Sequence, residues 1–265
     1  MIFGVRAHDY GKLPADELFS AISGHGWQAV QLAFPKAITG VDSFGGVTPE
    51  IIAKTKEALD ASGLSVAVLG VYVDPSLVDE NERATQVSFL SAAIPQAKAL
   101  NAGCVGTETT VRGPHSDMRA LYRSLEELLP EAELHGVNIG IEPVFIHNLS
   151  TPELTAKMLR DFSSTRLKTI FDPINLLKLE DVDSQNDLWA RCLDCFGDHI
   201  VAVHIKGAYR QAGENTMLTD APFESSVVDY GFLFSLLKTV GAPILREGVV
   251  PSEAAGDLAF LRGLL

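Results

Sequence analysis

The sequence is short of cysteine, and this scarcity excludes a disulfide-stabilised secreted domain. Its 265 residues contain three cysteines, an odd and small number that suits a reducing cytoplasm. Cys192 and Cys195 form a C-x-x-C pair, but the pair lies inside a predicted helix over 186–196 and no second ligand pair is nearby. We therefore expect structural thiols rather than a redox or zinc site.

Basic residues and long apolar runs are also scarce. The chain has 21 Lys and Arg against 34 Asp and Glu, a formal net charge of −13. Such a field repels polyanions, so we expect neither nucleic acid nor an anionic membrane as a partner. No apolar run approaches the roughly 20 residues that cross a bilayer, and residues 1–5 enter a predicted strand without the segments of a signal peptide. We expect a cytoplasmic protein.

What the chain does have is a regular alternation of strand and helix patterns. Apolar residues make up 46% of it, sufficient for a large core. Thr48-Pro49-Glu50 and Thr151-Pro152-Glu153 each predict a helix start, because a capping threonine precedes a proline and an acid in the first turn. The polar segment 211–227 has no periodic pattern. Strands are predicted at 2–7, 29–34, 64–73, 104–108, 137–142, 167–172, 200–204 and 242–247.

Eight strand–helix units without a break in composition predict an α/β protein, a single (β/α)₈ TIM barrel over residues 1–265. Four of its strands end on a side chain that can bind a metal ion: Glu142, Asp172, His204 and Glu247. Parallel strands bring these ends to one face of the barrel, the face where barrel enzymes carry their active sites.

Buried carboxylates without partners are costly, so the strand-end cluster predicts a cation. Three carboxylates and an imidazole suit Mn²⁺, Mg²⁺, Co²⁺ or Zn²⁺. The alternative for each residue is a polar side chain on the barrel rim that its neighbours satisfy. Finding all four at matching strand ends favours the metal site.

Further polar residues near the strand ends are candidates for binding a substrate. Lys206 lies two residues beyond His204, so strand alternation points both side chains to one side, and Arg210 begins the next loop. Each could hold substrate oxygens or a phosphate, or be a solvated charge. Tyr72, near the end of the third predicted strand, could wall the pocket, but the aromatic core is the favoured assignment. The remaining candidates lie at or just past the ends of other predicted strands: His8, Gln31, Glu108, His147 and Asn175.

The strand ends resemble those of the xylose isomerase-like superfamily of sugar isomerases and epimerases, over essentially the whole chain. The resemblance implies that one divalent metal binds to the four strand-end ligands, commonly Mn²⁺, Mg²⁺ or Co²⁺, and that Glu142 and Glu247 also transfer protons. The matching motifs are V-G-T-E-T at 105–109, I-E-P at 141–143, F-D-P-I-N at 171–175, H-I-K at 204–206 and R-E-G at 246–248.

The subgroup within that superfamily stays open. Arg210 has the spacing of the substrate-binding arginine of ketose 3-epimerases, but those enzymes have His and Glu where this chain has Asn175 and Asn148. Members resembling inosose dehydratases have an aspartate where this chain has Gly207.

Together, the residues and the resemblance predict a metal-dependent isomerase or epimerase of a keto-sugar or sugar phosphate, which acts through a cis-enediolate. Mn²⁺ is expected ahead of Mg²⁺, Co²⁺ or Zn²⁺. One alternative is a dehydratase or lyase of a keto-sugar or inosose, and another is a sugar-binding barrel without activity. An apurinic-site endonuclease would need three zinc ions and more histidines than the seven present. The sugar and the number of subunits are left open, a homo-oligomer included.

Overall fold

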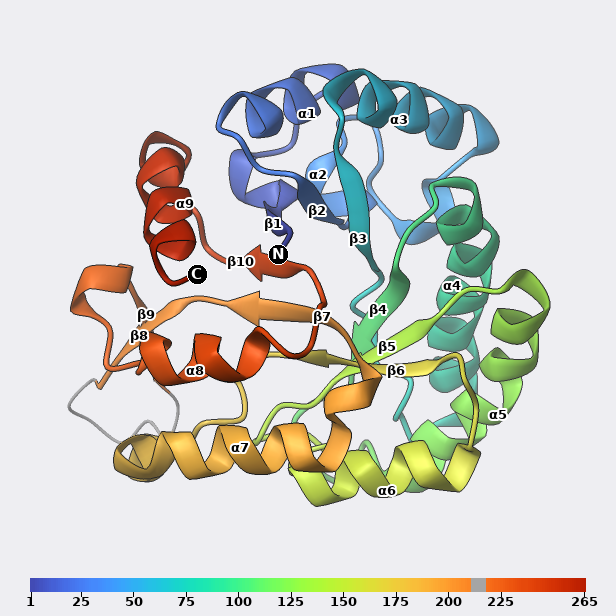
Figure 1. The fold of residues 1–265 in the computed structure, drawn as a ribbon. Coiled ribbons are helices and arrows are strands. Elements are labelled where there is room, and N and C mark those ends of the chain that lie inside the picture. The colour runs from blue at the N-terminus through green and yellow to red at the C-terminus, as the bar shows by residue number, and fades with distance from the viewer. Residues whose placement is uncertain (211–217) are drawn as a thin grey trace.

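The computed structural model describes residues 1–210 and 218–265, which form a closed barrel of eight parallel strands with helices around it (Figure 1). The hydrogen-bonded order is β1-β10-β7-β6-β5-β4-β3-β2, and pairing of β1 with β10 closes the barrel. The predicted (β/α)₈ fold is confirmed. The barrel strands are β1 (Phe3–Arg6), β2 (Ala29–Leu32), β3 (Ser65–Gly70), β4 (Cys104–Glu108), β5 (Ile139–Glu142), β6 (Leu167–Phe171), β7 (Ile200–Ile205) and β10 (Ile244–Arg246).

A helix follows each barrel strand and covers the outside of the barrel (Figure 1). These helices are α1 (Ala15–Gly24), α3 (Pro49–Ser62), α4 (Glu80–Ala99), α5 (Met118–His135), α6 (Pro152–Phe162), α7 (Gln185–Phe196), α8 (Tyr230–Leu237) and α9 (Ala254–Gly263), with a short α2 (Phe34–Ala37) after β2. Short 3₁₀ helices lie at Ala7–Tyr10, Phe44–Gly46, Leu179–Ser184, Gly197–His199, Phe223–Ser225 and Pro251–Glu253. Within the described ranges, no helix is long and apolar enough to cross a membrane.

Both helix starts predicted from a Thr-Pro-Glu sequence are confirmed. The Thr48 hydroxyl accepts a hydrogen bond from the Ile51 amide at 3.3 Å, and the Thr151 hydroxyl accepts one from the Leu154 amide at 3.2 Å. Each satisfies one of the amides that a helix leaves free at its start. The helices start near the carboxyl ends of the strands, so the two caps lie at the face of the barrel where the strand-end residues lie.

The apolar core has two parts, one between the barrel and the helices and one inside the barrel. The inner part consists of residues from six strands and none from a helix: Ala29, Ala67, Val68, Cys104, Ile170, Ala202 and Leu245. Small residues are needed there, because a Cβ added at Gly106 would lie 2.4 Å from the Val68 side chain and 2.8 Å from that of Ile170. The barrel is therefore a filled core whose open end is the carboxyl face of its strands.

The segment after β7 contains structure that its lack of periodicity did not predict. Strands β8 (Gly207–Tyr209) and β9 (Thr219–Ala221) form an antiparallel pair outside the barrel. Three-residue strands are too short to show an alternating pattern. A Cβ at Gly207 would lie 2.2 Å from the Ala221 carbonyl oxygen, so glycine permits this close pairing. Residues 211–217 of the predicted loop lie outside the described residues.

Candidate functional site

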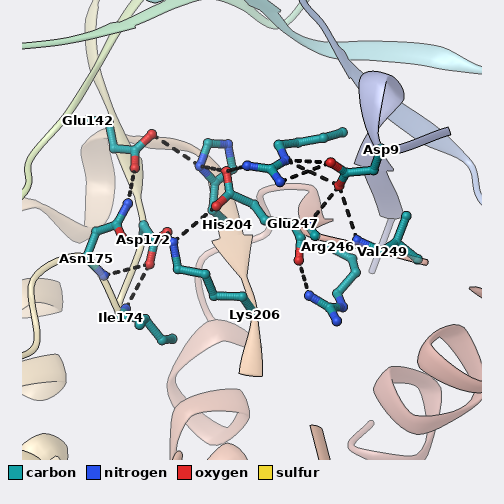
Figure 2. A network of polar contacts seen from close by, with 12 residues as sticks. Asp9, Glu142, Asp172, Ile174, Asn175, His204, Lys206, Arg246, Glu247 and Val249 are labelled. Atoms are coloured by element: carbon teal, nitrogen blue, oxygen red, sulfur yellow. Dashed lines mark hydrogen bonds and ion pairs between the residues drawn. The ribbon is translucent and has the colours of Figure 1, made fainter. Parts of the chain in front are cut away.

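The four strand-end residues come together at the carboxyl end of the barrel. Glu142 ends β5 and Asp172 follows β6, while His204 lies in β7 and Glu247 follows β10. Asp172 and His204 are fully buried, and Glu142 and Glu247 are 3% and 9% exposed. The β-ladder explains the convergence, because β5, β6, β7 and β10 are consecutive neighbours in the barrel. Figure 2 shows their side chains pointing toward one another.

His204 lies between the two glutamates. Its Nδ1 is 3.2 Å from Glu142 Oε2 and 3.3 Å from Glu247 Oε1. Burial lowers the pKa of His204, but the carboxylates of Glu247 and Glu142 outweigh burial and raise that pKa to about 9. Both ring nitrogens are buried, and neither has a well-aligned hydrogen bond within the described part of the chain. A positive charge at this position, either a bound cation or the proton of the imidazole itself, would stabilise the two carboxylates.

Lys206 is the internal counter-ion of the cluster. Its Nζ lies 2.9 Å from Asp172 Oδ2 and 3.2 Å from Glu247 Oε2. Burial lowers the pKa of Lys206, but the carboxylates of Asp172 and Glu247 raise it above its ordinary value. For Glu247 the two effects have the opposite signs. Burial raises the pKa of its carboxyl group, but the positive charges of His204, Lys206 and Arg6 outweigh burial and lower that pKa to about 2. Glu247 is therefore ionised at neutral pH.

Asn175 connects Lys206 to the second glutamate. Its Nδ2 donates to Glu142 Oε1 at 2.7 Å, and its Oδ1 accepts from Lys206 Nζ at 2.8 Å. The Asn175–Lys206 bridge thus binds one oxygen of each glutamate, Oε1 of Glu142 and Oε2 of Glu247. The other oxygen of each faces His204 (Figure 2). This bridge fixes the orientation of both carboxylates.

Arg6 and Asp9 hold Glu247 from the opposite side. Arg6 ends β1, and its guanidinium lies 3.0 Å from Asp9 Oδ1 and 3.6 Å from Glu247 Oε1. Asp9 Oδ2 accepts hydrogen bonds from the amides of Gly248 at 2.7 Å and Val249 at 3.2 Å. Gly248 has a φ of 70°, a conformation that favours glycine. Sequence reasoning missed both Arg6 and Asp9, because nothing local indicates a partner some 240 residues away.

The cluster opens into a polar cavity of about 240 Å³. Five of the seven residues predicted to bind a substrate line it: His8, Gln31, Glu108, Asn175 and Lys206. Glu142 and Glu247 line it as well, and so do three residues not predicted for the site: Arg6, Lys36 and Tyr72. Tyr72 was assigned to the core, but its hydroxyl reaches the cavity and donates to Glu142 Oε2 at 3.4 Å.

Two predicted residues are not among those that line the cavity. Arg210 is half-exposed and pairs with Asp183 at 2.5 Å. His147 lies behind Glu108, with its Nδ1 3.9 Å from Glu108 Oε2. Burial, with the nearby charges of Glu142 and Glu247, raises the pKa of Glu108 to about 7. Glu108 is thus a carboxyl group that exchanges protons near neutral pH.

Residues 19–258 match the family model described as xylose isomerase-like TIM barrel. The chain belongs to this family. A search of curated proteins found no match.

Solved structures of other xylose isomerase-like barrels have the same fold over nearly the full length. One is such a protein from Mycobacterium smegmatis in complex with magnesium, with 17% identity, a TM-score of 0.74, and coverage of 100% of this chain and 97% of that chain. Another is 3-keto-D-glucoside 4-epimerase from E. coli, with 18% identity, a TM-score of 0.76 and 99% of each chain covered. D-Psicose 3-epimerase from Clostridium cellulolyticum H10 with D-tagatose has 14% identity, a TM-score of 0.75, and coverage of 100% and 99%.

In this xylose isomerase-like barrel, a buried triad could hold a metal ion. Glu142, Asp172 and His204 each offer one ligand atom, and these atoms lie within 4.8 Å of one another. Two carboxylates and an imidazole are a donor set that divalent ions of borderline or hard character accept. The unpartnered nitrogens of His204 fit the same group. Glu247 reaches the triad through its contact with His204.

Proposed function

We propose that this protein is a metal-dependent isomerase or epimerase of a keto-sugar, which transfers a proton next to the carbonyl group. The observation that carries the proposal is the arrangement of Glu142 and Glu247. Their carboxylates approach the same imidazole nitrogen at 3.2 and 3.3 Å, and both residues line the cavity. Two fixed carboxylates beside one small polar cavity suit proton removal from one carbon and proton return to the other face or to the adjacent carbon.

A divalent ion bound by Glu142, Asp172, His204 and Glu247 would polarise the carbonyl as a Lewis acid, and Mn²⁺ is our first choice ahead of Mg²⁺, Co²⁺ or Zn²⁺. The remaining chemistry belongs to the side chains. One glutamate takes the carbon-bound proton and gives a cis-enediolate, and the other glutamate returns a proton. The Lys206 ammonium supplies positive charge where the enediolate oxygens develop negative charge.

The other proposed roles are in substrate binding. His8, Gln31, Glu108 and Asn175 line the cavity and can hydrogen-bond hydroxyl groups. Arg210 and His147 are proposed as outer substrate contacts on sequence grounds alone. The chain is proposed to work as a single domain in the cytoplasm on a small-molecule sugar.

A dehydratase is the second candidate, and Glu108 is the observation that favours it. A carboxyl group with a pKa of about 7 at the cavity can protonate a β-hydroxyl as that hydroxyl leaves from the enediolate. Epimerisation and isomerisation give a product of unchanged mass, whereas dehydration gives a keto-product that has lost water. Mass spectrometry of the products separates the two.

The test is exchange of substrate C–H protons with D₂O, followed by NMR on protein reconstituted with Mn²⁺. A panel of ketopentoses and ketohexoses should include substrates that exchange and are converted. Glu142→Gln and Glu247→Gln should each lower conversion by about 10²–10⁴-fold, the usual contribution of a general acid or base. Glu57→Gln, on the exposed face of α3, is the matched control. Near-normal conversion by either cavity variant contradicts the two-glutamate mechanism.

A further inference from the structure

The lining of the cavity divides into side chains that bind one another and side chains that have few partners. Glu142, Asn175, Lys206 and Glu247 form one continuous network. Arg6 and Tyr72 contact the two glutamates of this network. The other lining residues come from the ends of β1, β2 and β4 and from α2: His8, Gln31, Lys36 and Glu108, which we call the open half.

Gln31 is the most informative residue of the open half. It lies in β2 beside Arg6 of β1 and is only 2% exposed, yet its Oε1 is buried and has no hydrogen-bond partner among residues 1–210 and 218–265. Nδ1 of the nearby His8 is also buried and unpartnered. A buried polar atom left unsatisfied is destabilising. Both residues line the cavity, and each keeps a polar atom that no described group satisfies, which singles these two side chains out for binding a ligand there.

The charges around the cavity decide which ligand group fits the open half. The Arg6 guanidinium donates through Nε and one terminal nitrogen to Asp9, and its other terminal nitrogen faces Glu247. Lys206 is held between Asp172 and Glu247.

Lys36 is then the one lining cation without an ion pair in the described part of the chain, and it is exposed. A phosphate group there would meet this single ammonium and the carboxyl groups of Glu108, Glu142 and Glu247. Phosphate sites usually offer free arginine forks or several backbone amides.

Hydroxyl groups match the open half better than an anion does. A hydroxyl both donates and accepts, and the open half offers a carboxamide, an imidazole, an ammonium and a carboxyl group. The volume of about 240 Å³ lies below the range of about 300–1,000 Å³ usual for drug-sized ligands, so a monosaccharide suits it.

We propose that His8, Gln31, Lys36 and Glu108 form a subsite for the distal hydroxyl groups of an uncharged sugar, so that the substrate is a free keto-sugar rather than a sugar phosphate. This inference rests on the proposed function. It adds the chemical class of the substrate and the residues that recognise its non-reacting end.

The experiment compares kcat/KM for C–H exchange in D₂O with three kinds of probe: the free D-ketohexoses, their 6-phosphates, and the three-carbon ketose dihydroxyacetone. The best free ketohexose should exceed its 6-phosphate by about 10²-fold, because the phosphate faces like charges. A 6-phosphate that reacts as well as its free sugar, or better, overturns the subsite and leaves the proposed function intact. Absence of exchange with every probe, dihydroxyacetone included, overturns both.

Single substitutions test whether Gln31 and Lys36 bind the distal hydroxyl groups. Gln31→Ala should lower the ratio of kcat/KM for the ketohexose to kcat/KM for dihydroxyacetone by about tenfold, the effect of one lost hydrogen bond to a distal hydroxyl. Exposed Lys36→Ala, which does not threaten folding, should lower the same ratio. Gln28→Ala is the control, because Gln28 lies just before β2, at the end away from the cavity, and its side-chain Oε1 accepts a hydrogen bond from the Phe3 amide. An unchanged ratio in both Gln31→Ala and Lys36→Ala refutes the subsite, since a purely structural effect would slow both substrates equally.

Discussion

The two glutamates of the site have different neighbours. Glu142 receives hydrogen bonds from two neutral groups, Asn175 Nδ2 and the Tyr72 hydroxyl. Both glutamates contact His204, and Glu247 also faces two cations, Lys206 and Arg6. The cations around Glu247 lower the pKa of its carboxyl group to about 2. We infer that the two carboxylates are not interchangeable in the proposed proton transfer.

Substitution of Asp9 tests whether metal binding depends on the orientation of the Glu247 carboxylate. It binds Arg6 and the two amides that follow Glu247, yet it is not among the residues that line the cavity. Asp9→Asn removes the charge that holds Arg6 in place and should weaken Mn²⁺ binding by about 10–100-fold, the usual effect of losing a group that orients a ligand. Isothermal titration calorimetry with Mn²⁺ measures this.

The control for Asp9 is Asp16→Asn in the exposed first turn of α1, which should leave Mn²⁺ affinity unchanged. Rescue of Mn²⁺ binding by Asp9→Glu would support a positioning role that depends on charge. Equal Mn²⁺ affinity in Asp9→Asn and the unmodified protein would show that Glu247 does not depend on this contact.

Glu108 predicts a pH dependence of stability. Its folded-state pKa of about 7 lies above the ordinary value of 4.5, so its contribution to stability is complete below about pH 4.5 and is lost as the pH rises to 7. The metal-free protein should therefore lose about 1–2 kcal/mol of unfolding free energy relative to Glu108→Gln over that interval, after allowance for solvent screening.

Urea unfolding of both proteins at pH 4.5 and pH 7 gives the difference for Glu108. Glu57→Gln, an exposed substitution, should run parallel to the unmodified protein at both pH values. A difference between the Glu108 variant and the unmodified protein that grows in the opposite direction would mean that Glu108 is stabilised as a carboxylate.

At the scale of helices and strands, the sequence was sufficient to predict the fold and the meeting of the four strand-end residues at one face of the barrel. The reason is local: each strand is a buried run that ends on a polar residue, and parallel strands place all such ends at one face. Cys104–Glu108 was predicted with the bounds that the structure has. For Tyr72 the core was favoured over the pocket wall, and the structure places its hydroxyl at the cavity. An aromatic residue near the end of a strand gives the same sequence pattern in both positions.

Contacts across the barrel mouth were not predictable. Whether Arg6 contacts Glu247 depends on barrel closure between β1 and β10, which brings residues of opposite chain ends together. The spacing of Arg210 from His204 did not indicate its ion pair with Asp183, because the chain leaves the barrel through β8 before it reaches Arg210. Spacing along a sequence carries no information on such a change of direction.

The two threonine caps make a prediction about single helices. Thr48→Ala and Thr151→Ala should each lower the unfolding free energy by about 1 kcal/mol, because each leaves a first-turn amide without its side-chain acceptor. Thr48→Ser and Thr151→Ser, which keep the hydroxyl, should lose much less. Chemical denaturation measures all four. A loss of stability as large in the serine variants would assign the effect to the threonine methyl group rather than to the cap.

At the scale of the whole molecule, the proposed metal links the functional face to global stability. The formal charge is −13, and three buried carboxylates meet at the barrel mouth with Lys206 and His204 as their cations. A divalent ion that binds only the folded barrel stabilises it in proportion to the logarithm of its concentration. At about 100 times the dissociation constant, the gain is about 2.7 kcal/mol.

That gain should appear as a rise in Tm of about 5–10 °C for a protein of this size, measured calorimetrically after EDTA treatment and addition of Mn²⁺. His204→Asn should lose most of the rise, because the triad then lacks its imidazole ligand. His115→Ala, an exposed histidine outside the cluster, should keep the full rise and so controls for non-specific binding. If Mn²⁺ raises the Tm of His204→Asn as much as that of the unmodified protein, the ion binds elsewhere and the strand-end cluster is held by Lys206 and its own hydrogen bonds alone.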